Sequence, residues 1–137
     1  MALQFVKQYS LTEALAHKVH DFSSDTLKIA FTNTAPNLAW TQLSDLTEIA
    51  YTNFPSDRTV VVASSSQTAG QYSLFLTDKQ WTATGTVAAF RYIYIYNDDA
   101  TNDELIGYID WGAEVNLIVD NIFKLDFDGV NGLFTIG

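Results

Sequence analysis

The stretch Phe90-Arg-Tyr-Ile-Tyr-Ile-Tyr-Asn97 decides the fold class, because tyrosine and isoleucine alternate along it. In an extended chain successive side chains point to opposite faces, so the tyrosines share one face and the isoleucines the other. Both faces are then largely apolar. Either a loop of the same chain covers the tyrosine face of this central strand, or the tyrosines contact another subunit. The candidate interface residues on this face are Tyr92, Tyr94 and Tyr96.

Shorter runs of β-branched and aromatic residues lie on both sides of this stretch, separated by turn residues at intervals of roughly 8–12 residues. With the central strand itself, predicted over 88–96, the full set is 27–31, 59–63, 71–77, 81–84, 88–96, 105–111, 115–119, 122–127 and 133–136. The Asp-Gly and Asn-Gly pairs between the last two runs predict a hairpin turn. Short strands at this spacing predict a mainly β protein, an antiparallel β-sandwich or jelly-roll-like module.

Helical patterns are confined to two short segments. Ser10-Leu-Thr-Glu13 matches a capping box, and apolar residues then recur at helical spacing, which predicts a short N-terminal helix over residues 11–21. A weaker helical turn is predicted at residues 44–50. Residues 1–9 precede the cap and are interpreted as an N-terminal arm, and residues 10–137 as a single sandwich domain.

The N-terminal arm is itself apolar. In a monomer such an arm is an edge strand, and in an assembly it is a contact arm between subunits. Its candidate interface residues are Leu3, Phe5, Val6 and Tyr9.

Composition excludes several classes of protein. The chain has 137 residues, of which 47% are hydrophobic, and this fits one globular domain and not a disordered segment. It has no cysteine, which excludes disulfides and cysteine-based metal or catalytic sites. A net charge of −9 argues against binding to nucleic acid or to an anionic membrane surface. We find neither a signal peptide nor an apolar run long enough to span a membrane, so we expect synthesis in a cytosol.

The negative charge is unevenly distributed. Residues 1–96 have six basic and seven acidic side chains, whereas residues 97–137 have one basic and nine acidic ones. The acidity is therefore a property of the last third of the chain, above all of the loop 97–104. We expect this end to face solvent or a basic partner, and the near-neutral, aromatic part to be the adhesive side.

Candidate catalytic and metal-binding residues are few. His17 and His20 are spaced to share one face of a helix, but no further ligands follow at a recognisable spacing. The sequence contains neither a nucleophile elbow nor a glycine-rich phosphate loop. The loop 126–132 has Val130 where a calcium loop needs an oxygen ligand. We expect no enzymatic activity, cofactor or metal.

Paired carboxylates are more numerous, and glycosidases use two carboxylates that flank a sugar. Most of the pairs lie in polar loops or beside turns, where they are expected to be solvated. The pairs are Asp98/Asp99, Asp103/Glu104, Asp110/Glu114 and Asp126/Asp128.

Several segments together resemble a family of small structural proteins of tailed bacteriophages and prophages. The segments are Ala30-Phe-Thr-Asn-Thr-Ala-Pro36, Leu46-Thr-Glu-Ile-Ala50, Thr82-Ala-Thr-Gly85, Phe90-Arg-Tyr92, Tyr96-Asn-Asp98, Leu105-Ile-Gly-Tyr108, Asp110-Trp-Gly112, Asp126-Phe-Asp128 and Asn131-Gly132. The functional match within this family is to capsid cement, or decoration, proteins.

The resemblance implies a β-sandwich or jelly-roll-like module on the outer surface of the virion shell, made in the cytoplasm of a host bacterium. Its implied partners are the major capsid protein and further copies of itself, as a dimer or trimer. Two other functions stay open: a tail, neck or fibre-associated virion protein, and a carbohydrate-binding module.

Overall fold

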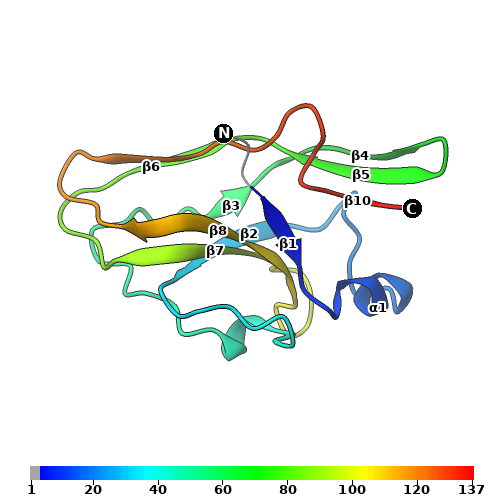
Figure 1. Cartoon of the computed structure of the whole chain (residues 1–137), viewed down its shortest axis with the longest axis horizontal. Coiled ribbons are helices and arrows are strands. Elements are labelled where there is room, and N and C mark those ends of the chain that lie inside the picture. The colour runs from blue at the N-terminus through cyan, green and yellow to red at the C-terminus, as the bar shows by residue number, and fades with distance from the viewer. Residues whose placement is uncertain (1–3) are drawn as a thin grey trace.

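Antiparallel strands arranged in two layers are the main secondary structure of the chain in the computed structural model, which describes residues 4–137. Five strands form one layer (Figure 1), in the order β1 (Phe5–Lys7), β8 (Leu105–Val115), β7 (Phe90–Asn97), β2 (Leu27–Thr32) and β3 (Thr59–Val60). The other layer contains the sheet β10 (Phe134–Ile136), β5 (Gln71–Leu76), β4 (Val62–Thr68) and the ribbon β6 (Lys79–Thr82), β9 (Ile122–Leu125). The prediction of a mainly β protein with a short N-terminal helix is confirmed.

The core lies between the two layers and is rich in aromatic rings. Phe31 of β2 is at its centre, with its ring 4.7 Å from Phe90, 4.9 Å from Phe54 and 5.3 Å from Trp81. Ile93 and Ile95 of β7 point into the same core and have no exposed surface. The isoleucine face of the decisive stretch therefore packs against the second layer, as a strand with period two requires.

The helix α1 (Leu11–Ala16) is shorter than the predicted segment 11–21. Lys18 adopts a left-handed conformation with φ of 63°, and the Val19 N–H donates to the Ala14 carbonyl oxygen. This is a Schellman ending, normally made with glycine, which the sequence pattern did not indicate. The predicted capping box is also wrong, because Ser10 has helical φ and ψ and its side chain makes no capping hydrogen bond.

Three other predicted elements differ from the structure. The weak helical turn at 44–50 is a 3-10 helix over Leu43–Asp45. The runs 105–111 and 115–119 are not two strands, because β8 continues from the first to Val115. The predicted hairpin between the last two runs is wrong, since β9 pairs with β6 and β10 pairs with β5. Gly132, with φ of 81°, turns the chain from one pair to the other.

The N-terminal residues 5–7 form the edge strand β1 beside β8. The Phe5 ring stacks on Phe134 at 5.8 Å, so this strand contacts both layers. None of the helices in the described residues 4–137 has the length and apolar character needed to cross a membrane.

Substitution of Gly107 tests how firmly β1 is held. A methyl group at this position would overlap the Val6 carbonyl oxygen and the Phe5 ring. We expect Gly107→Ala to displace β1 and lower the free energy of unfolding by about 1–3 kcal/mol in urea denaturation. Gly129→Ala is the control, because an added methyl there meets no atom within 4 Å. Equal stability of the two variants would show that β1 is not fixed against β8.

Candidate functional site

The three candidate tyrosines share the outer face of the five-stranded sheet, and their own chain covers it. Tyr94 and Tyr96 are buried and Tyr92 is half-buried. Residues 37–49, the cover segment, lie over this face. The segment and the sheet together form an apolar cluster. Its buried residues are Ala30, Leu46, Tyr94, Tyr96 and Leu105, and the half-buried residues Trp40, Leu43, Tyr92 and Tyr108 pack against them.

Hydrogen bonds attach the cover segment at both of its ends. The buried Gln8 side chain donates to the carbonyl oxygens of Asn37 and Trp40 at 3.0 and 2.9 Å. Near the other end, the Thr32 hydroxyl donates to the Thr47 carbonyl oxygen at 2.6 Å. Because buried polar groups are costly to leave unpaired, these bonds make the segment part of the fold.

Tyr94 is the most deeply buried of the candidate residues, with 0% of its surface exposed. Its ring lies 5.5 Å from Tyr108 and 6.5 Å from Trp40. Burial raises the pKa of Tyr94 to about 12. Its hydroxyl lies near the Asn37 backbone, which opposes this rise in pKa, but it makes no hydrogen bond of regular geometry in the described part of the chain. In this conformation Tyr94 stabilises the sheet and offers no surface to a partner.

Two substitutions of Tyr94 separate its ring from its hydroxyl. We expect Tyr94→Ala to lower the free energy of unfolding by about 3–5 kcal/mol, because it leaves a cavity under the cover segment. Tyr94→Phe keeps the ring and removes an unpaired buried hydroxyl, so it should be neutral or stabilising. Thermal melting of the free protein measures both. A small effect of Tyr94→Ala would mean that the cover segment does not bury this ring in solution.

The candidates in the N-terminal arm differ in exposure. Phe5 and Val6 are half-buried in β1, whereas Tyr9, just after the strand, is 72% exposed. Leu3 lies outside the described residues. Tyr9 is thus the most exposed of the described candidate residues.

A pocket of about 420 Å³ lies beside α1, and the sequence pattern did not indicate it. This α1 pocket joins the chain after α1 to the inner side of β5 and β10. Its lining is mostly apolar and aromatic, with a polar rim: Leu15, Lys18, His20, Asp21, Phe22, Ser23, Ser65, Tyr72 and Ile136. The size suits a small ligand or one side chain of a partner. The helical pattern places His20 in the predicted segment 11–21 and Phe22 directly after it, and does not associate either residue with Tyr72.

His20 is buried, with 6% of its surface exposed, at the wall of the α1 pocket. The Asp99 N–H donates to Asn97 Oδ1, which fixes the orientation of the Asn97 amide group. The amide nitrogen of Asn97 then lies 3.0 Å from His20 Nδ1 and 2.6 Å from the Asp25 carboxylate. His20 Nδ1 is therefore an acceptor, and the neutral ring carries its proton on Nε2. Burial lowers the pKa of His20, an effect opposed by the charges of Glu104 and Asp25.

The lowered pKa of His20 makes stability depend on pH. The folded chain prefers the neutral ring, while the unfolded chain takes up a proton below the ordinary pKa of 6.5. We therefore expect the stability that His20 contributes to be present above pH 6.5 and to be lost as the pH falls from there through the lowered pKa.

Urea denaturation between about pH 7 and 5.5 measures this dependence. The range lies above the pH at which most Asp and Glu side chains titrate, so histidine dominates the change in stability. His20→Gln cannot titrate and should remove it, whereas the same change at the exposed His17 should leave it intact. The same slope in wild type and His20→Gln would contradict the assignment.

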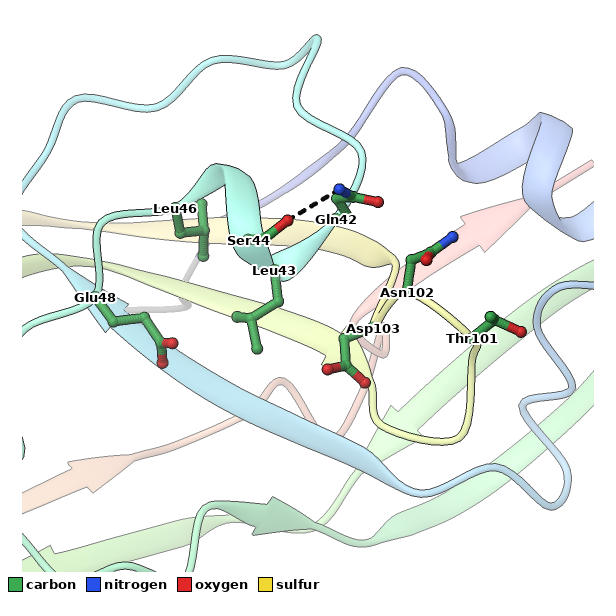
Figure 2. Close-up of a pocket in the computed structure, with 8 residues that line it drawn as sticks. All are labelled: Gln42, Leu43, Ser44, Leu46, Glu48, Thr101, Asn102 and Asp103. Carbon is green, nitrogen blue, oxygen red and sulfur yellow. Dashed lines mark hydrogen bonds between the residues drawn. The ribbon is translucent and has the colours of Figure 1, made fainter.

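A second pocket, of about 390 Å³, lies between the cover segment and the acidic loop 97–104. Figure 2 shows Leu43 between the carboxylates of Glu48 and Asp103 in this view, with a hydrogen bond between Gln42 and Ser44 above it. Burial raises the pKa of Asp103, and the nearby charges of Asp98 and Glu104 act in the same direction. The pocket is lined by the carboxylates of Glu48 and Asp103, which favours contact with solvent or a basic group.

Three of the paired carboxylates are engaged in ion pairs or in hydrogen bonds of a turn. Asp110 is held by Arg91 at 2.8 and 3.2 Å, and Asp98 pairs with Lys28 at 3.1 Å. Asp128 accepts two backbone N–H groups of its own turn, which lowers its pKa. Within residues 4–137, no group of three or more potential ligands is placed to hold a metal ion.

Comparisons of the chain with models of known protein families, with curated proteins and with solved structures find no match.

Proposed function

We propose that the protein is a capsid cement protein of a tailed bacteriophage. It would bind the outer surface of the assembled shell and stabilise contacts between major capsid subunits. The observation that carries the proposal is the position of the segments that resemble this family. Most of them fall on neighbouring parts of one unit, namely β2, β7, β8 and the cover segment: residues 30–36, 46–50, 90–92, 96–98, 105–108 and 110–112.

The proposed mechanism is adhesive. A protein that binds assembled subunits and not free ones shifts the assembly equilibrium toward the shell by mass action. Copies that share a symmetry axis add avidity from several weak contacts. Because Tyr94 and Tyr96 are buried and Tyr92 is half-buried, we place the adhesive surface at the exposed Tyr9 with its half-buried neighbours Phe5 and Val6.

Binding to shells tests this function. We expect the protein to bind saturably to expanded shells that lack it, at a copy number set by the shell symmetry, in a co-sedimentation assay. Tyr9→Ser should weaken binding about tenfold, because a hot-spot aromatic residue contributes well over 1 kcal/mol. Ile118→Ser is the control, since Ile118 is 58% exposed and lies beyond the end of β8, away from residues 107–109 that pair with β1.

Other outcomes of the same experiment identify the alternatives. A few copies per particle would support a tail, neck or fibre protein. Binding to immobilised polysaccharide without binding to shells would support a carbohydrate-binding module, with the α1 pocket as its site. A strictly monomeric protein that never co-sediments with shells would contradict the cement function.

A further inference from the structure

The hairpin of β4 and β5 lies in the longest uncharged stretch of this acidic chain, which is followed in length by residues 29–44. No charged side chain occurs in residues 59–77, between Arg58 and Asp78, although the chain has a net charge of −9. In the view of Figure 1 the hairpin extends past the ends of β7 and β8. Its exposed strand β4 is rich in serine, so the absence of charge is not a consequence of burial.

The outer edge of β4 is unpaired among the described residues. β4 is an end strand of its sheet and pairs only with β5. It has seven residues, whereas the edge strands β1 and β10 have three and β3 has two. The two strands of the remaining ribbon carry Lys79 and Lys124. Natural edge strands are usually short or protected by charge or proline, and β4 is neither.

Regular pairing of β4 with β5 extends from Ser64 to Thr68, after a bulge that follows Val62. In this part Ser64, Ser66 and Thr68 alternate on the outer side of the sheet and are all exposed. Small polar side chains allow a further strand to approach the free backbone groups without a steric or desolvation penalty.

We propose that β4 pairs antiparallel with β4 of a second copy across a two-fold axis, so that the two three-stranded sheets become one. Charge decides between possible occupants of this edge. Two copies with a net charge of −9 repel one another, and an uncharged edge is where they meet with the least repulsion. A basic partner would gain more by docking on the acidic loop 97–104. An isologous contact closes at two copies.

This pairing concerns the free protein in solution and does not depend on shell binding. It selects a dimer from the dimer or trimer that the sequence resemblance implies. The dimer can form without shell binding, and shell binding can occur without the dimer. The two experiments therefore test the two proposals independently.

Sedimentation over a concentration series tests the pairing. We expect a monomer–dimer equilibrium that Ser66→Lys weakens at least about tenfold, because the antiparallel pairing brings the two added positive charges close together near the middle of the contact. The matched control is Ser73→Lys, on the residue of β5 that pairs with Ser66. It places the same charge on the same face one strand inward, and should change the equilibrium by less than about twofold. Thr68→Lys provides a second edge variant should Ser66→Lys fold poorly.

Crosslinking locates the contact. The chain has no cysteine, so Ser66→Cys introduces a single thiol. A short bismaleimide should join two copies of this variant rapidly and two copies of Ser73→Cys much more slowly. The proposal is overturned if the wild type is a monomer at all concentrations, if Ser66→Lys leaves the dimer intact, or if both thiols crosslink equally.

Discussion

The structure depends on the burial of β7 on both faces. Its isoleucines fill the core between the layers, and its tyrosines need a second cover that no sheet supplies. The chain provides this cover with residues 37–49, so a long irregular segment becomes a third layer. A strand with one polar face would need no such segment. The alternation of large apolar residues along β7 therefore determines the central strand and also where the longest irregular connection lies.

Two buried amide side chains connect the parts that packing alone leaves loose. Gln8 joins the N-terminal segment to the cover segment through two carbonyl oxygens. Asn97, at the end of β7, connects His20, Asp25 and the acidic loop. Each amide uses both of its N–H groups in these contacts, and both residues are almost fully buried. Hydrophobic burial drives the packing of the layers, and the hydrogen bonds of these amides fix which loops lie against each other.

The sequence predicts the elements in which local pattern and tertiary burial agree. The alternation in β2 and β7 was sufficient to place both strands, because their side chains alternate between two buried faces. The sequence does not predict most of β4, because its serines show no alternation of apolar and polar residues. Its pairing with β5 follows from the turn at Ala69 and Gly70. The sequence does not predict where α1 ends, because Lys18 adopts a left-handed conformation that glycine normally adopts. The α1 pocket joins segments that are distant along the chain, which a local pattern does not encode.

The charge distribution acquires a structural meaning once the loops are placed. Two carboxylates at this end of the sheet accept backbone hydrogen bonds: Asp99 of the acidic loop accepts from the Thr26 N–H, and Asp25 from the Asp21 N–H. These anions fix turns at one end of the sheet, and they make that end repel another copy of the chain. The hairpin β4–β5 needs no such anions, because strand pairing satisfies its backbone on one side. In the proposed pairing, the acidic turns and the uncharged edge would act together, because charge repulsion keeps the acidic end away from a second copy and leaves β4 free to meet it.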